Sequence, residues 1–426
     1  MPFAALDLHK KIVEAVVLDD TGSVLHRDHF STTREAITGF ARNHLPPDTH
    51  IAIEATTNTW AVVRLLQPFV AEVVVSNPLR TRAIAEAKIK TDKVDALVLA
   101  NLLRCDFLPR VWIPDPATVA LRHQSTERAT LVADRTRIKN RIHSVLHQRL
   151  ISAPHDDLFC PQSLAWLRQL DIDPLGRQAL DRNLRQLGHI EEEIFDLSGT
   201  LAQQAHDDAR VKLLMTLPGV DFPVAQTLLA VLGDVARFPS ADKAAAYLGL
   251  VPSTRQSAAH CYHGPITKQG SGHARWMLVQ GAQALAVHPG PLGVFFRKLA
   301  KKKNRNVAVV ASARKLVAIA WHMLKNNEPY RYAQPATLKA KFDRLRIRAT
   351  GKRKSSGNAK GAPRPAGYGS GVRTRAVPSV DEVMLEAGLP PLPPLSPGEQ
   401  KMLGERGSAV FVSSIHQAKR VPRRSK

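Results

Sequence analysis

The sequence predicts an α/β N-terminal domain, a central helical insert, a mainly α-helical C-terminal domain and a basic tail without fixed structure. Short apolar segments alternate with helical ones over residues 1–112. Apolar residues then recur in steps of three and four within residues 113–205, which is typical of paired helices. We expect the C-terminal domain to span residues 206–330. From residue 331 the composition turns to Gly, Pro, Ser and Arg, which favours disorder.

Length and charge restrict the class of function. The 426 residues are 44% hydrophobic and carry a net charge of +23, which is enough for two or three domains and predicts a polyanionic partner. We expect nucleic acid and no membrane, because no apolar run of spanning length and no signal-peptide pattern is apparent. Three scattered cysteines, Cys105, Cys160 and Cys261, indicate a reducing cytoplasm and no disulfide framework.

The N-terminal elements follow one recognisable order. Three meandering strands are succeeded by alternating helices and strands, which is the order of the ribonuclease H fold. The expected strands span residues 3–8, 12–18, 24–30, 51–55 and 72–76, and the expected helices span residues 34–44, 61–69 and 90–104.

Four acids fall where such a sheet would collect a cation. Asp7 is on the first strand, Glu54 ends the fourth, and Asp92 and Asp95 share one face of the closing helix. Sites in open α/β sheets lie at strand ends near a switch in strand order, where these carboxylates would hold one or two Mg²⁺ ions for phosphodiester chemistry. The alternative for the helical pair is a first turn that complements the helix dipole, with Thr91 near the cap.

These acids lie in segments that resemble a known family. ALDLHK, IAIEAT and KTDKVDALVLA resemble the N-terminal, RuvC-like domain of the DEDD-type insertion-sequence transposases. The third segment matches the pattern K-T-D-x-x-D-A-x-x-L-A over eleven residues. By this resemblance Asp7, Glu54, Asp92 and Asp95 are the catalytic and metal-binding acids, and Mg²⁺ is the implied cofactor. Other acids of the region, including Glu14, are interpreted as surface charge.

The segment from Tyr247 to Leu278 resembles the C-terminal domain of the same transposases. There G-L-x-P, a nucleophilic serine and I-T-K-x-G followed by arginine occur in that order, and residues 249–252, residues 266–270 and Arg275 match. Ser257 takes the place of the nucleophile, although Ala258 follows it where the family has glycine. Ser253 and Ser271 are the chemical alternatives.

Two further segments, an apolar seam in the insert and a turn after it, each allow two interpretations. A seam of apolar residues in the insert favours pairing between chains, with packing inside its own chain as the alternative. A Leu217–Val220 turn resembles a helix-hairpin-helix, which would bind phosphate or serve packing. The seam consists of Leu180, Leu184, Leu187, Ile190, Ile194, Leu197 and Leu201.

Basic side chains are expected to bind nucleic acid through its phosphates. The tail adds 20 Lys and Arg residues against 6 Asp and Glu. The candidates in the folded regions are Arg135, Lys139, Arg255, Lys268, Arg275, Lys301, Lys302 and Arg305. No zinc is predicted around His260 and Cys261, because a second ligand pair at finger spacing is missing.

The resemblance implies a transposase, or DNA recombinase, that cuts and rejoins donor and target DNA. It further implies guidance by a structured RNA encoded by the element, a dimer or tetramer, and a place in the prokaryotic cytoplasm at the nucleoid. One alternative is a Mg²⁺-dependent Holliday-junction-type nuclease that cuts with water and leaves Ser257 inert. The other is a catalytically inactive, nucleic-acid-binding relic of a mobile element.

Overall fold

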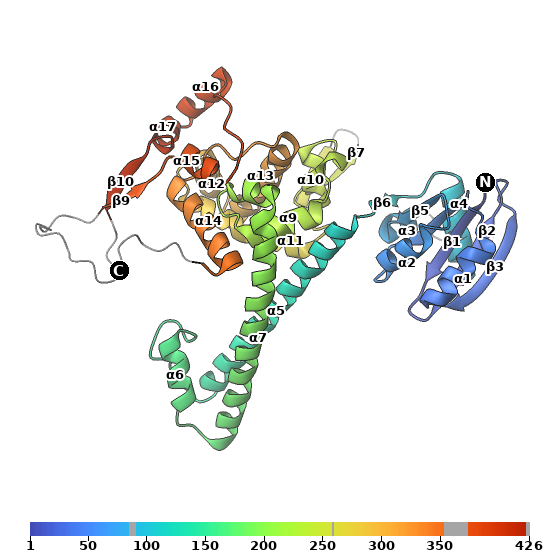
Figure 1. Cartoon of the computed structure of the whole chain (residues 1–426), viewed down its shortest axis with the longest axis horizontal. Helices are drawn as coiled ribbons and strands as arrows, with labels where there is room; N and C mark the ends of the chain where they lie inside the picture. Colours follow the sequence, from blue (N-terminus) through green and yellow to red (C-terminus); the bar gives the residue numbers. More distant parts are fainter. Residues whose placement is uncertain (85–90, 258–259, 353–373, 423–426) are drawn as a thin grey trace, which may run out of the picture. The chain divides into compact units, whose positions relative to one another are not determined.

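A computed structural model describes residues 1–84, 91–257, 260–352 and 374–422 (Figure 1). The chain divides into two compact units, Met1–Asp115 and Pro116–Lys426, here called unit 1 and unit 2. The predicted border after residue 112 lies close to the observed one. The predicted helical insert and C-terminal domain, however, belong to the same unit.

Unit 1 is a six-stranded sheet with helices on both faces. Its strand order is β3-β2-β1-β4-β5-β6, and β1, β4 and β5 run parallel to one another. The mixed α/β class and the predicted order from β1 to β5 and α4 are confirmed, and α3 and β6 are additional elements that the sequence pattern does not predict. The elements are β1 Phe3–Leu8, β2 Ile12–Leu18, β3 Val24–Ser31, α1 Arg34–His44, β4 His50–Glu54, α2 Thr59–Leu66, β5 Glu72–Ser76, α3 Pro78–Ile84, α4 Asp92–Arg104 and β6 Arg110–Val111.

Alternation along the strands gives this sheet two apolar faces. Leu6 on β1 and Ile53 on β4 belong to the core under α1 and α2. Their neighbours Ala5 and Ala52 belong to the core under α4. Since successive side chains of a strand point to opposite faces, these two cores show to which face each strand residue points.

Unit 2 is mainly helical and carries two small hairpins. The elements up to the first hairpin are α5 Pro116–His147, α6 Pro161–Gln169, α7 Pro174–Asp207, α8 Ala209–Met215, α9 Phe222–Leu232, η1 Val235–Arg237, α10 Ala241–Tyr247, β7 Pro252–Ser257 and β8 His260–Ile266. The remaining ones are α11 Gly272–Gln283, η2 Ala284–Val287, α12 Pro291–Lys302, α13 Arg305–Asn326, α14 Pro335–Thr350, β9 Thr374–Val377, α15 Val380–Glu386, α16 Pro397–Glu405, α17 Ala409–Ile415 and β10 Lys419–Pro422.

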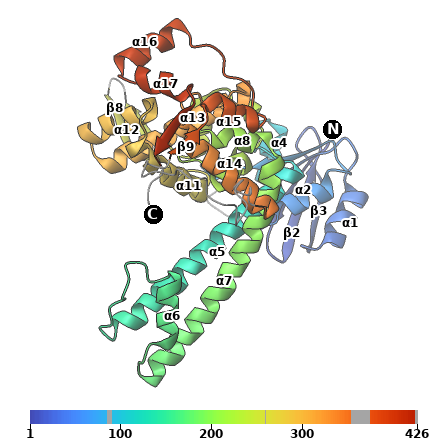
Figure 2. The ribbon, with the colours of Figure 1, turned by 60° about the vertical axis from the view of Figure 1, so that its left-hand side comes forward.

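The long helices α5 and α7 run side by side, with α6 near their far ends (Figures 1 and 2). Ile142 on α5, Leu167 on α6 and Leu180 on α7 are fully buried in one cluster. The α14 helix covers a further part of α7. The favoured pairing of this seam between chains is therefore not supported, because the seam packs inside its own chain.

Helix α13 corrects the expectation that no segment reaches spanning length. By length and composition it is long and apolar enough to cross a membrane. However, Leu316, Val317 and Ala320 are fully buried in the main core of unit 2. The composition of α13 is thus that of a central core helix.

The predicted disorder from residue 331 onward is wrong for most of the described part of that segment. Leu338 and Leu345 on α14 and Val380 on α15 are buried in the main core of unit 2. Ser379 and Ser396 form capping boxes that fix the starts of α15 and α16. The apolar residues here are few but helically spaced, so averaged composition conceals them. Residues 353–373 and 423–426 lie outside the described residues.

Candidate active site

The topology of unit 1 brings Asp7 and Glu54 together. The chain leaves β1 toward β2 on one side and returns through α1 to β4 on the other, so a switch in strand order lies between β1 and β4. Leu6 is paired with Ile53, which places Asp7 and Glu54 at the next position of neighbouring parallel strands. Asp7 and Glu54 each lie two residues after a residue of the core under α4, Ala5 and Ala52, and therefore point to the same face as that core. The two carboxylates thus share the α4 face at the carboxyl ends of their strands.

Helix α4 brings the other two acids. The Thr91 hydroxyl accepts a hydrogen bond from the backbone N–H of Val94 at 3.3 Å and caps the helix. The helix therefore begins at Asp92, and Asp92 and Asp95 both lie in its first turn. Both acids occupy the first turn of α4, as the helix-dipole interpretation requires, and their role as cation ligands stays a prediction. One carboxylate oxygen of Asp92 and one of Asp7 lie within 4.8 Å of each other and of a ring nitrogen of His9.

His9 lies between two of the acids. Its Nε2 is 3.1 Å from Asp7 Oδ2 and 3.4 Å from Asp92 Oδ1. Burial raises the pKa of Asp7, His9 opposes that shift by its charge and hydrogen bond, and the carboxylates of Asp92 and Asp95 add to it. A site that concentrates negative charge at such a cost is suited to a divalent cation, which would relieve the repulsion.

Two polar residues near these acids were not singled out from the sequence, His9 within the cluster and Glu14 on the neighbouring strand. His9 had no assigned role, and Glu14 was interpreted as surface charge. Glu14 is opposite Asp7 in the β1–β2 pairing, is only 9% exposed, and accepts a short hydrogen bond from His29 Nδ1. An acid within the apolar run of β2 is costly without a partner, and that signal would have identified Glu14.

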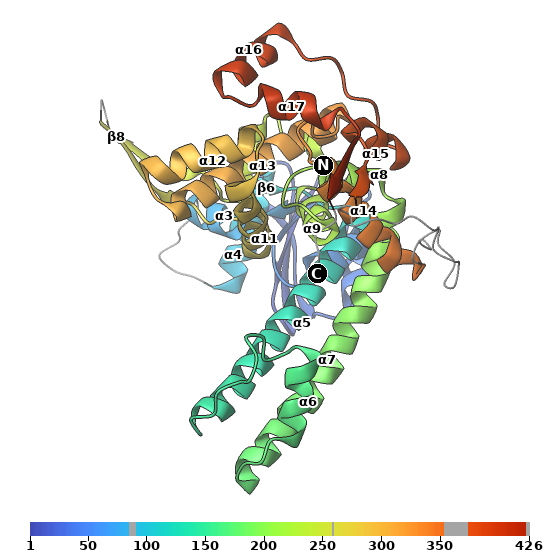
Figure 3. The ribbon, with the colours of Figure 1, turned by 90° about the vertical axis from the view of Figure 1, so that its left-hand side faces the viewer.

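Ser257 has a very different setting in unit 2. It is the last residue of β7, is paired with His260 on β8, and both residues are exposed. The hairpin extends away from the neighbouring helices (Figure 3). Ala258, the departure from the family pattern, lies outside the described residues. The hydroxyl of Ser257 is therefore carried on an exposed part of unit 2.

The two alternative serines have structural surroundings. Ser253 lies against Gly264 of the opposite strand, where an added Cβ would come within 2.5 Å of the serine Oγ. Ser271 is the N-cap of α11, and its hydroxyl accepts the N–H of Ala274 at 3.2 Å. Of the three serines, Ser257 is therefore the most accessible to a substrate.

The motifs flanking the hairpin pack on each other. Gly249 has φ +66°, and a Cβ there would lie 2.4 Å from the carbonyl oxygen of Gln269, so only glycine fits. The guanidinium of Arg275 donates to the carbonyls of Leu248, Gln269 and Gly270. Arg275, expected at nucleic acid, thus holds the two loops below the hairpin together. Its nucleic-acid contact stays a prediction.

The Leu217–Val220 turn also has a packing role. A Cβ on Gly219 would lie 1.9 Å from the carbonyl oxygen of Gly281, so the turn lies directly against α11. Asp221 pairs with Arg344 of α14 at 3.0 Å. These contacts favour packing over phosphate binding for this turn.

The predicted basic residues have different surroundings, and Arg135 interacts with Arg128, which is not among them. Burial lowers the pKa of Arg128 on α5, and the like charges of Arg135 and of Arg348 on α14 lower it further. The repulsion among these like charges would be relieved by a phosphate. Lys139 instead pairs with Glu191 across α5 and α7, at 3.9 Å. The exposed members are Arg255, Lys268, Lys301, Lys302 and Arg305.

The sheet of unit 1 and the helices that cover it are consistent with a DEDD nuclease-like domain. Residues 4–150 match the transposase model of the DEDD, IS110 type, and residues 211–293 match the model described as transposase, IS116/IS110/IS902 family. The chain belongs to this family of DEDD transposases, which are enzymes that act on DNA.

Relatives of known name agree with this assignment. The transposase for insertion sequence element IS1328 of Yersinia enterocolitica is 25% identical over 323 residues, which cover 74% of this chain and 94% of that protein. The pilin gene-inverting protein of Moraxella bovis is 26% identical over 299 residues, covering 66% and 81%. A Sinorhizobium fredii relative is 26% identical over 272 residues, and the match covers 64% of this chain and 65% of the relative.

Proposed function

We propose that this chain is the transposase of an insertion sequence and that it cuts and rejoins DNA with two sets of residues. The acids Asp7, Glu54, Asp92 and Asp95 form one set, and Ser257 is the nucleophile. The observation that supports the proposal is the approach of Asp7 and Asp92 to each other beside a switch in strand order, with Glu54 at the end of the parallel neighbour of β1.

Mg²⁺ is the cation that this donor set suits. Carboxylate oxygens are hard ligands, and burial together with the like charges of Asp92 and Asp95 raises the pKa of Asp7, a repulsion that a divalent cation would relieve. When bound, Mg²⁺ would draw charge from the scissile phosphate and stabilise the leaving oxygen. The four acids of this chain would hold the cation, and His9 would orient Asp7 and Asp92.

Ser257 would supply the covalent step. Its Oγ attacks the phosphorus, a serine–phosphate ester forms, and the bond to one DNA oxygen breaks. The hydroxyl proton passes to a base, for which His260 is the nearest in register. Attack by an incoming DNA hydroxyl would reverse the step and rejoin the strand.

The partners follow from charge and family. Donor and target DNA, and a structured guide RNA encoded by the element, would bind through the Arg128, Arg135 and Arg348 cluster and the exposed basic residues of α12 and α13. A dimer or tetramer at the nucleoid of the prokaryotic cytoplasm completes the proposal. A relative that inverts a pilin gene supports recombination as the outcome.

Trapping the protein on labelled donor DNA tests the serine chemistry. The full chain is incubated with Mg²⁺, DNA and the transcript of the element's non-coding flank, and the modified peptide is mapped. We expect the adduct on Ser257, its loss in Ser257→Ala, weak retention in Ser257→Cys, and its persistence in Ser253→Ala. An adduct on another serine would instead identify that serine as the nucleophile.

A Mg²⁺-dependent nuclease that uses water is the second candidate. The observation in its favour is that Asp7, His9 and Asp92 come together within unit 1 alone. It requires cleavage without a covalent adduct and full activity of Ser257→Ala. Absence of both metal binding and cleavage would instead identify an inactive, nucleic-acid-binding relic.

A further inference from the structure

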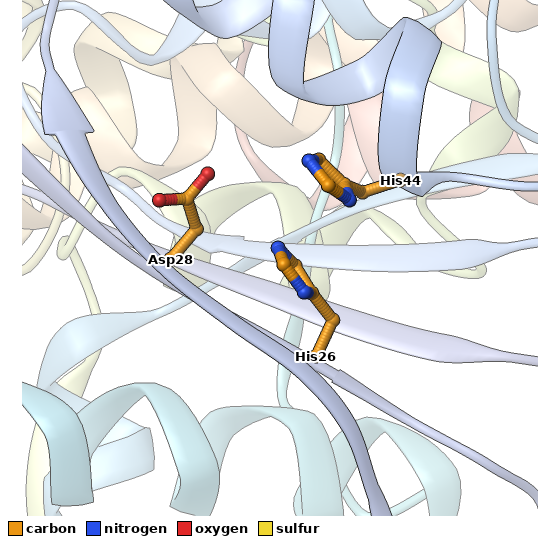
Figure 4. A group of neighbouring side chains, drawn as sticks. All are labelled: His26, Asp28 and His44. Carbon is orange, nitrogen blue, oxygen red and sulfur yellow. The ribbon is translucent and has the colours of Figure 1, made fainter.

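A second group of metal-binding side chains lies on the other face of the unit 1 sheet. His26 and Asp28 are two residues apart on β3 and therefore share one face, and His44 is the last residue of α1 (Figure 4). His26 is paired with Val17 of the core under α1 and α2. The acids of the candidate active site point to the α4 face, so this group is separate from them.

The three side chains converge. One ring nitrogen of each histidine and one oxygen of Asp28 lie within 4.8 Å of one another. The carboxylate of Asp28 is oriented by the backbone N–H of His29, which donates to Oδ1 at 2.7 Å. Among the described residues, Nε2 of His26 is buried and has no hydrogen-bond partner. A buried, unsatisfied imidazole nitrogen is unfavourable, and a metal ion would satisfy it.

We propose that His26, Asp28 and His44 bind a divalent transition-metal ion, represented here by Zn²⁺. Two imidazole nitrogens and one carboxylate oxygen suit Zn²⁺ and do not suit Mg²⁺, which prefers oxygen ligands. Three protein ligands leave the fourth position of a tetrahedral ion to water.

The rings must rearrange slightly to bind the ion. The imidazoles of His26 and His44 are stacked, with centroids 3.9 Å apart and planes 9° apart, so their lone pairs run parallel. Convergence on one ion requires one ring to turn about its Cβ–Cγ bond. His44, half-buried at the end of α1, is the ring that turns.

Binding would fasten an edge of the sheet. β3 is the outermost strand, and His44 belongs to the helix that packs beside it, so the ion would link the edge strand to α1. The proposed role is structural, since the site lies on the face opposite the acids. It is independent of the proposed strand-transfer chemistry and would survive the failure of that proposal.

The competing explanation is an aromatic stack. Phe40 lies 5.5 Å from the His44 ring and 5.0 Å from the Phe30 ring, centroid to centroid. A purely aromatic cluster predicts no stoichiometric metal binding and tolerates replacement of His44 by Phe.

Calorimetry on the chelator-treated full chain decides between them. Zn²⁺ is titrated in excess Mg²⁺, which occupies the acidic cluster, and thermal unfolding is followed with and without Zn²⁺. We expect one equivalent of Zn²⁺ to bind and raise the unfolding midpoint by a few degrees. His26→Gln and His44→Gln should each lose that equivalent and the rise in midpoint.

Two control variants exclude other zinc ligands. His50→Gln removes a unit 1 histidine that pairs with Glu72 instead, at 3.1 Å, and should keep the equivalent. Cys261→Ser, on the hairpin of unit 2, should keep it too. Substituted Co²⁺ should give a visible d–d band in the wild type that His44→Gln abolishes. Unchanged stoichiometry in a folded His44→Gln, or full Zn²⁺ stabilisation of His44→Phe, would overturn the proposal.

Discussion

The acidic cluster of unit 1 and the serine hairpin of unit 2 place reactive groups in opposite ways. Strand pairing holds Asp7, partly buried, near the end of β1, and the Thr91 cap holds the exposed Asp92 in the first turn of α4. Ser257 is exposed on a two-stranded hairpin. The loops that flank this hairpin are held together by the close packing of Gly249 and by the hydrogen bonds of Arg275. A cation site requires several ligands at fixed positions, whereas a nucleophile requires access to its substrate. The partial burial of Asp7 and the exposure of Ser257 are what these two proposed roles would require.

The energetic consequences differ as well. Asp7 is partly buried, and burial together with the like charges of Asp92 and Asp95 raises its pKa, so keeping it ionised lowers the stability of the fold. An exposed hydroxyl such as that of Ser257 carries no comparable cost, because water satisfies it in both the folded and the unfolded chain. Variants whose stability and activity are both measured therefore test whether the acidic cluster lowers the stability of unit 1 while the serine hairpin carries no such cost.

Replacing Asp7 should have the largest effect. Asp7→Asn should lower strand cleavage at least roughly 10³-fold, because a ligand charge at the cation is lost. In the absence of metal the same variant should unfold at a higher temperature at pH 7. The folded pKa of Asp7 is raised, so its contribution to stability falls as pH rises above the unfolded value of 3.8.

Cleavage assays and thermal unfolding of the metal-free protein measure these two opposite changes. Glu35→Gln, which neutralises an exposed acid in the first turn of α1, is the matched control and should change neither. Wild-type cleavage by Asp7→Asn would contradict the cation site, and a lower unfolding temperature would contradict the electrostatic cost.

Arg275 tests the support beneath the hairpin. Arg275→Ala leaves three carbonyl groups without their donor and should destabilise unit 2 by about 2–3 kcal/mol. Adduct formation should fall, while the cation affinity of unit 1 stays unchanged. Denaturant unfolding and Mg²⁺ titration provide the two measurements. Lys268→Ala changes an exposed neighbouring residue and should preserve the free energy of unfolding. Equal losses of stability in the two variants would show that Arg275 does not position the hairpin.

How far the sequence predicts these two regions depends on the range of the interactions. Alternation and turn residues fix β1 to β5 almost residue by residue, and Thr91 marks the start of α4, because these signals are local. The contact of His9 with Asp92 joins segments far apart in the chain. No spacing rule reveals it.

Long-range packing explains the remaining differences. The seam on α7 has the same a/d spacing whether its partner is α5 or another chain, so the sequence alone leaves its partner open. Composition averaged over residues 331–426 hides α14, whose Leu338 and Leu345 gain their stability only against unit 2. Arg275 occupies its family position, yet its role depends on carbonyls that the fold supplies.

Lys341 gives unit 2 a buried charge of opposite sign to Asp7. It lies on α14, is 6% exposed, and its Nζ donates to the carbonyls of Met215 at 2.8 Å and Leu217 at 2.6 Å. Burial lowers its pKa from 10.5 to about 8. Between those values the unfolded chain binds more protons than the folded one, so stability should increase with pH, by roughly 3 kcal/mol at most.

Denaturant unfolding at pH 8, 9 and 10 measures this slope for the wild type and for Lys341→Met. The variant lacks the titrating group and should lose the rise, whereas Lys339→Met, at a partly exposed ion pair with Glu386, should keep it. Parallel pH profiles for the wild type and Lys341→Met would show that Lys341 is not the source.

Ser271 gives the smallest effect and the sharpest separation of structure from chemistry. Its hydroxyl caps α11, so Ser271→Ala should cost about 1 kcal/mol of stability, and Ser271→Asp should retain most of it, because aspartate is also a good cap. Both variants should still form the covalent adduct, since the proposed nucleophile is on the hairpin. Unfolding curves and adduct yield are measured on the same preparations. Loss of the adduct in a folded Ser271→Ala, together with its presence in Ser257→Ala, would transfer the nucleophile from the exposed hairpin to the helix cap and end the contrast between the two regions.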